Sequence, residues 1–212
     1  VFLDVVNGLY RRLVLEARGE PVPPPLENYE EVTAIQMRSA AIALEAVRHL
    51  AAGEEHAAFE SAKLAIETFV EFGGFDDDFP TYWCQLLDVA LSVDELEVAG
   101  RWLHKVADAP RGQLSTVLRA LVPYFRARLG AVTNADDALV DADFVSGATA
   151  LGAFGAPYWQ GRCLLEHAEW LSERGRATDA TVLVDEADRI FTSLRATPWI
   201  DRARKARTLT LR

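Results

Sequence analysis

Apolar residues recur along this chain at the spacing of a helix face, and the pattern continues almost from end to end. Phe2, Val6, Leu9 and Leu13 form one such stripe, with a period near that of the α-helix. No segment alternates apolar and polar residues at the period of two that a half-buried strand requires. Alanine (33) and leucine (26) also far outnumber isoleucine (5), and β-branched residues are the ones that favour sheets. The sequence therefore predicts an all-α protein.

Glycine, proline and acidic residues divide this pattern into about ten helices. Pro157 is placed to open a helix, because proline suits the first helical turn. Gly53 and Gly175 are placed in turns between helices, and Gly73-Gly74 are expected to end a helix, because glycine readily adopts the left-handed conformation that closes one. The predicted helices span residues 2–17, 30–52, 56–72, 81–92, 95–107, 113–130, 136–154, 158–174, 177–195 and 198–207.

The run Pro21-Val22-Pro23-Pro24-Pro25 marks the best candidate for a domain boundary. Closely spaced prolines exclude a helix, and the resulting connection is long for a helical bundle. We therefore expect residues 1–25 to form a leading helix and a Pro-rich linker. Residues 26–212 are expected to form one helical-repeat domain that ends in a capping helix.

Four prolines with aromatic neighbours recur at intervals of 43, 34 and 41 residues. They are Pro80, Pro123, Pro157 and Pro198. We interpret each as the start of the first helix of a helix pair. A period of 34 to 45 residues with two helices in each interval is typical of a helical solenoid.

Residues at the expected helix contacts support the same architecture. In the last full pair, the positions of the tetratricopeptide pattern are occupied by Leu164, Ala168, Leu171, Ala180, Val184 and Ala187. Ala46, Ala58 and Ala65 occupy the matching small positions 122 residues earlier. The middle pairs fit less well, with Arg128 and Val140 at two of these positions. The sequence predicts a right-handed, tetratricopeptide-like superhelix of stacked antiparallel helix pairs with degenerate repeats.

A resemblance to a known family covers about residues 113–200. It is carried by segments 155–159 (GAPYW), 164–171 (LLEHAEWL), 175–176 (GR), 187–191 (ADRIF) and 194–199 (LRATPW). They resemble the C-terminal tetratricopeptide-like regions of large, mostly actinobacterial signalling proteins. Those proteins carry a class III nucleotide cyclase domain and a STAND-type ATPase domain upstream. The resemblance implies a helical arm that binds a partner and adjusts the upstream domains. It assigns no catalytic or nucleotide-binding residue to this chain.

Charge and composition exclude several classes of function. A net charge of −10 argues against a nucleic-acid surface, which usually carries a basic stripe. No apolar run approaches the roughly 20 residues that span a bilayer, so no membrane partner is expected. Only two cysteines, Cys84 and Cys163, are present. They do not make a disulfide scaffold, so we expect a cytoplasmic protein with both thiols buried.

The chain shows no motif for catalysis, a cofactor or a metal. It lacks the phosphate-binding loop G-x-x-x-x-G-K-[ST] and the nucleophile elbow G-x-S-x-G. Its histidines form no H-x-x-x-H pair, and we expect His167 to pack between the helices of its own pair. The run 76–78 (DDD) lacks the spacing of a calcium loop and is interpreted as an acidic helix cap. We therefore expect no enzymatic activity, cofactor or metal.

The tryptophans and the basic last helix can each be interpreted as binding features or as structural ones. Trp83, Trp159 and Trp199 could form a binding stripe, but their regular placement favours sealing of neighbouring repeats. Arg202, Arg204, Lys205 and Arg207 could contact an anionic partner, but a charged last helix also suits a solvated cap.

These patterns favour an interaction and regulatory module that binds a protein or peptide segment, or upstream domains of the same chain, on a concave face. The expected lining residues are Phe125, Arg162, Leu165 and Glu169. The alternative is the ligand-sensing domain of a transcriptional regulator whose DNA-binding part lies outside this chain.

Overall fold

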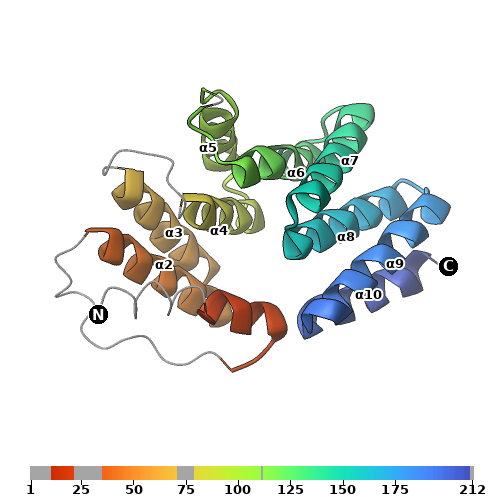
Figure 1. Ribbon diagram of the computed structural model, residues 1–212, viewed down its shortest axis with the longest axis horizontal. Helices are drawn as coiled ribbons and strands as arrows, with labels where there is room; N and C mark the ends of the chain where they lie inside the picture. The colour runs from red at the N-terminus through yellow and green to blue at the C-terminus, as the bar shows by residue number, and fades with distance from the viewer. Residues whose placement is uncertain (1–10, 22–34, 71–78, 111, 211–212) are drawn as a thin grey trace. The chain divides into compact units, whose positions relative to one another are not determined.

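The computed structural model describes residues 11–21, 35–70, 79–110 and 112–210, and every regular element in these residues is a helix (Figure 1). A helical segment spans 11–18. The remaining helices are α2 (Ile35–Ala51), α3 (Glu55–Val70), α4 (Phe79–Ser92), α5 (Leu96–Ala107), α6 (Thr116–Val132), α7 (Asp137–Phe154), α8 (Pro157–Glu173), α9 (Ala177–Leu194) and α10 (Thr197–Thr210). The all-α prediction is confirmed, and each of these helices overlaps one that was predicted. The Pro-rich run from residue 22, the glycine pair 73–74 and the acidic run 76–78 lie outside the described residues.

Local signals explain where several helices begin and end. The side chain of Asp136 caps α7 by accepting hydrogen bonds from the backbone N–H groups of Ala138 and Leu139, at 3.0 and 3.2 Å. Such a cap satisfies backbone donors that have no partner within the helix. Gly155 ends α7 with a φ of 82°, which is the left-handed conformation that favours glycine.

The described helices belong to two compact units. The first comprises residues 1–16 and 21–115, and the second comprises 17–20 and 116–212. The boundary predicted near residue 25 lies outside the described residues and stays a prediction. The division at 115/116 follows closely after Pro110 and Gly112, which the sequence presents as one helix break among several.

The helices of the first unit pack in chain order, α2 on α3, α3 on α4 and α4 on α5. Side chains of α4 also form hydrogen bonds to α5 and to α2. Trp83, which is fully buried, donates its indole N–H to the carbonyl of Trp102 in α5 at 3.2 Å. Gln85 donates its amide N–H to the carbonyl of Ala43 in α2 at 2.8 Å. Trp83 thus lies in the core and bonds the other helix of its predicted pair, and the sealing of neighbouring repeats stays a prediction.

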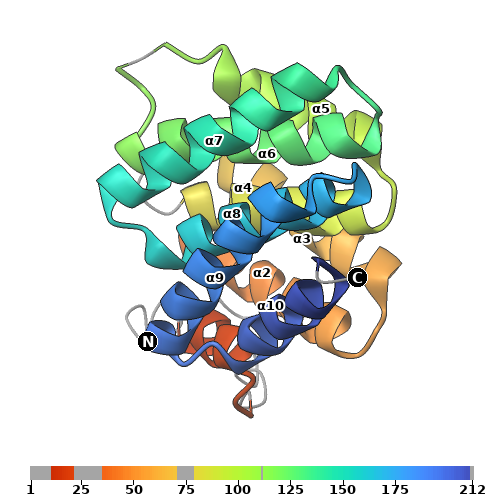
Figure 2. The ribbon, with the colours of Figure 1, turned by 90° about the vertical axis from the view of Figure 1, so that its right-hand side faces the viewer.

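The second unit combines sequential packing with contacts between alternate helices. The pairs α6–α7 and α8–α9 each pack closely, α7 lies on α8, and α10 lies on α9 (Figure 2). In addition, α6 contacts α8, and α8 contacts α10. A Cβ added to Gly147 would lie 3.0 Å from the backbone nitrogen of Tyr124, so glycine is what lets α7 approach α6 so closely. The predicted contact residues Ala168, Ala180 and Ala187 are fully buried.

One of the four marker prolines does not start a helix. Pro157 is the first residue of α8, and Pro80 and Pro198 are the second residues of α4 and α10. Pro123 instead lies inside α6. Proline lacks a backbone N–H and so removes one hydrogen bond from the helix interior. The buried neighbours Tyr124 and Phe125 show that this part of α6 is held by packing.

Ala180→Arg tests the packing of α8 against α9. Ala180 is fully buried, so a long charged side chain there would force the two helices apart. We expect a loss of at least about 3 kcal/mol in the free energy of unfolding, measured by urea denaturation. Val182→Arg on the same helix is the control, because Val182 is 68% exposed, and it should change stability by less than about 0.5 kcal/mol. Equal effects of the two substitutions would contradict the packing.

Candidate functional site

The second unit repeats one short motif on three of its helices. In α6, α8 and α10 an aromatic residue is followed three positions later by arginine. The three instances are Phe125 with Arg128, Trp159 with Arg162, and Trp199 with Arg202. These are the alternate helices of the unit, which contact each other in the order α6, α8, α10.

Each arginine of the motif lies over the aromatic ring of its own helix. The guanidinium carbon is 5.2 Å from the ring centroid of Phe125 in α6, 4.8 Å from Trp159 in α8 and 5.2 Å from Trp199 in α10. These distances are those of cation–π contacts. The motif therefore has the same local structure each time it occurs.

Arg162 also joins two helices. Its guanidinium carbon lies 4.7 Å from the ring of Trp199 in α10 as well as over Trp159 in its own helix. The ring of Tyr158 meets Trp199 edge-on, with centroids 6.0 Å apart. On the other side, Trp159 lies 6.1 Å from Phe125 in α6. Aromatic contacts thus run without a break across the three helices.

The carboxylate of Glu166 in α8 lies within ion-pair distance of all three arginines. One of its oxygens lies 2.9 Å from Arg128 Nε and accepts a hydrogen bond from the hydroxyl of Tyr124 at 3.0 Å. The other lies 3.6 Å from Arg162 and 3.7 Å from Arg202. The side chain of Glu166 is only 11% exposed. A carboxylate this buried needs such partners to offset its lost hydration.

A second carboxylate, Glu169, lies one turn further along α8. It accepts two hydrogen bonds from Arg202, from Nε at 2.9 Å and from Nη2 at 2.6 Å. This paired geometry is the strongest form of arginine–carboxylate contact. With side chains 30% and 42% exposed, Glu169 and Arg202 form the solvent-facing edge of the cluster. We call the whole cluster the Glu166 network, and it consists of Tyr124, Arg128, Arg162, Glu166, Glu169 and Arg202.

The four predicted lining residues divide into two groups. Arg162 and Glu169 belong to the Glu166 network. Phe125 and Leu165, at 1% and 0% exposure, are core residues, and Arg162 is also buried at 6%. Of the four, Glu169 is the one with a clearly exposed side chain, at 30%. The ring of Phe125 packs against Tyr124 at a centroid distance of 4.9 Å. Helical periodicity places all four on the sides of α6 and α8 that face neighbouring helices, and that they line a binding face stays a prediction.

Sequence reasoning missed Tyr124, Arg128, Glu166 and Arg202 as partners in one cluster. A signal for the arginines was present, because each follows a proline-marked aromatic residue by three positions. Glu166 had no such signal, since its role depends on which helices lie beside α8.

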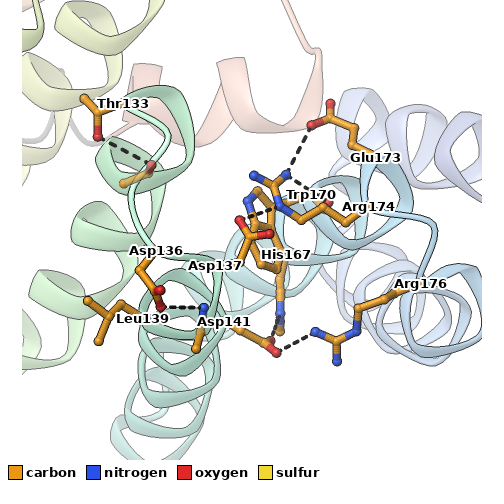
Figure 3. Close-up of polar contacts among 12 residues, drawn as sticks. Thr133, Asp136, Asp137, Leu139, Asp141, His167, Trp170, Glu173, Arg174 and Arg176 are labelled. Atoms are coloured by element: carbon orange, nitrogen blue, oxygen red, sulfur yellow. Dashed lines mark hydrogen bonds and ion pairs between the residues drawn. The ribbon is translucent and has the colours of Figure 1, made fainter.

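A second polar cluster joins α7 to α8 and to the start of α9 (Figure 3). His167 Nε2 lies 2.6 Å from Oδ1 of Asp141 in α7. Arg176, the residue before α9, donates a hydrogen bond to the other oxygen of Asp141 at 2.6 Å. The His167 ring stacks on Phe144 of α7, with centroids 5.0 Å apart and planes at 11°. The prediction that His167 packs within its own pair is thus corrected, because its ring faces α7.

The same cluster shifts two pKa values. Burial lowers the pKa of His167 below its ordinary value of 6.5, although the hydrogen bond and charge of Asp141 act in the opposite direction. Burial tends to raise the pKa of Asp141, but hydrogen bonds from Arg176 and His167, and their charges, outweigh it and hold that pKa below its ordinary range.

Other candidate groups serve the packing of the chain. Both cysteines are buried and form no disulfide. Burial raises the pKa of the Cys163 thiol, which donates a hydrogen bond to the carbonyl of Phe144 at 3.3 Å. Within the described ranges, no group of three or more His, Cys, Asp or Glu is arranged to hold a metal ion. No helix in those ranges is both long and apolar enough to cross a membrane.

Comparison with known proteins adds no relative. No protein family, curated protein or solved structure matches the chain significantly.

Glu166→Gln tests the central position of this carboxylate. The substitution keeps the shape but removes the negative charge that faces three arginines. We expect a loss of about 3 kcal/mol in the free energy of unfolding, the scale seen when one partner of a buried ion pair is removed.

Glu173→Gln is the matched control on the same helix, because the Glu173 side chain is 75% exposed and 3.9 Å from Arg174. It should change stability by less than about 0.5 kcal/mol. A loss for Glu166→Gln as small as that of the control would show that the network contributes nothing to folding.

Proposed function

We propose that this chain is a non-catalytic helical-repeat module that binds a protein or peptide segment on the side formed by α6, α8 and α10. The observation that carries this proposal is the aromatic-x-x-Arg motif on these three contacting helices. In solenoid proteins, equivalent helices of successive repeats form one continuous surface, and that surface is the usual binding site. The tetratricopeptide-like superhelix, with this side as its concave face, is part of the proposal.

The composition of this side supports binding. Tyr158, Trp159 and Trp199 are partly exposed, and Arg202 and Glu169 form its charged edge. Aromatic residues and arginine contribute most of the energy in protein interfaces. The buried contacts of the Glu166 network hold these side chains in fixed positions, so little conformational entropy is lost when a partner binds.

The proposed partner is an upstream part of the same signalling protein. We propose that the module is the C-terminal arm of a larger ATPase or nucleotide cyclase in the cytoplasm, and that it contacts upstream domains of that protein. The resemblance of residues 113–200 to such arms supports this part. Neither nucleic acid nor membrane is proposed as a partner, because the chain carries a net charge of −10.

An aromatic photo-crosslinking residue placed at Tyr158 in the full-length natural protein tests this function, because Tyr158 is partly exposed on this side and lies outside the Glu166 network. Crosslinks should form from this position to an upstream domain or a bound protein, and mass spectrometry identifies the linked peptide. The control position is Arg189 of α9, whose side chain is 71% exposed. Crosslinks from position 189 but none from position 158 would contradict the proposed binding side.

A further inference from the structure

The contact between α7 and α8 is a joint between two helix pairs, α6–α7 and α8–α9. Two carboxylates of α7 make its polar contacts. Asp137 pairs with Arg174, the residue after α8, at 2.8 Å. Asp141 is held by His167 of α8 and by Arg176, the residue before α9. The Glu166 network lies on α6, α8 and α10 and does not use these residues.

The surroundings of His167 suit a neutral ring. The residue is 4% exposed, stacks face to face on Phe144 at 5.0 Å and lies 6.1 Å from the ring of Trp170. Nε2 carries the hydrogen in the hydrogen bond to Asp141, so a neutral ring leaves Nδ1 without one. Protonation adds an N–H donor and a full positive charge to this aromatic-lined position, and burying such a charge is costly.

We propose that His167 makes the joint between the two helix pairs sensitive to pH, with the neutral ring holding α7 against α8 and the protonated ring weakening that contact.

Charged groups on each side of the ring act in different directions. Asp141 of α7 and Asp179 of α9 favour the protonated ring, whereas Arg176 disfavours it. The charge of Asp141 is already shared with Arg176, which reduces what it offers to an imidazolium. Burial outweighs the two carboxylates and keeps the pKa of His167 below 6.5.

The lowered pKa of His167 determines how the stability of the protein changes with pH. In the unfolded chain the imidazole binds a proton more readily than in the folded protein, so stability rises with pH across this range. The loss therefore begins as the pH falls through about 6.5, the ordinary histidine value. Asp141 remains ionised throughout this range, because its pKa lies below that of an ordinary aspartate. Its protonation would destabilise the protein only at lower pH. The response between pH 7.5 and 5.5 at this joint belongs to His167.

His167→Gln is the variant that tests the proposal, because glutamine can still donate to Asp141 but cannot be protonated. Thermal unfolding of the full chain is followed by circular dichroism between pH 7.5 and 5.5. The melting temperature of the parent should fall by a few degrees more than that of His167→Gln. His104→Gln is the control, since the His104 side chain is 79% exposed, and it should follow the parent. Parallel curves for the parent and His167→Gln, or a parent that gains stability on acidification, would overturn the proposal.

A second measurement covers the case in which His167→Gln does not fold. The protonation of His167 in the parent protein is followed by NMR, from the chemical shifts of its ring C–H groups as a function of pH. The resonances are assigned through their proximity to Phe144. The expected midpoint lies below 6.5. A midpoint at or above 6.5 would mean that Asp141 stabilises the protonated ring, and the proposed direction of the switch would be wrong.

Discussion

One carboxylate, that of Glu166, links three helices of the second unit, and its side chain is only 11% exposed. It is within ion-pair distance of Arg128, Arg162 and Arg202, and each arginine comes from a different helix. A carboxylate with so little exposure is stable only while its cationic partners stay in place. A shift of α6 or α10 along α8 would separate at least one arginine from Glu166. The network therefore specifies a register that apolar packing alone leaves less sharply defined.

Small residues set the spacing within each helix pair. A Cβ on Gly147 would meet the backbone of α6, and one on Gly161 of α8 would lie 2.9 Å from the ring of Phe191 in α9. The glycines thus set how closely α7 and α9 approach the helices they pair with. α8 occupies the central position, because one of its sides carries the Glu166 network and another carries His167 at the joint with α7. A single helix therefore carries close packing through Gly161, the ion pairs of Glu166 and the proposed pH response of His167.

The sequence predicted what depends on neighbouring residues and missed what depends on distant ones. Helix ends such as those at Asp136 and Gly155 follow from capping rules that involve only a few adjacent positions. The division at 115/116 leaves only a weak local signal, because it reflects how later helices group in space. Periodicity found the side of α8 that carries Arg162 and Glu169, but it could not show that Leu165 on that side is covered. The role of Glu166 became visible only when α6 and α10 were in place beside α8.

The central claim is that Arg128 and Arg202 act through Glu166, and a double-mutant comparison tests it most directly. Arg128→Met and Arg202→Met are each measured by urea unfolding in the parent and in a Glu166→Gln background. In the parent, each substitution should destabilise the protein by about 1–3 kcal/mol. In the Glu166→Gln background each substitution should cost clearly less than in the parent, because the ion pair with Glu166 is already lost, although Arg202 keeps its two hydrogen bonds to Glu169. Equal losses in both backgrounds would contradict the account, since they would show that the arginines contribute through packing and not through Glu166.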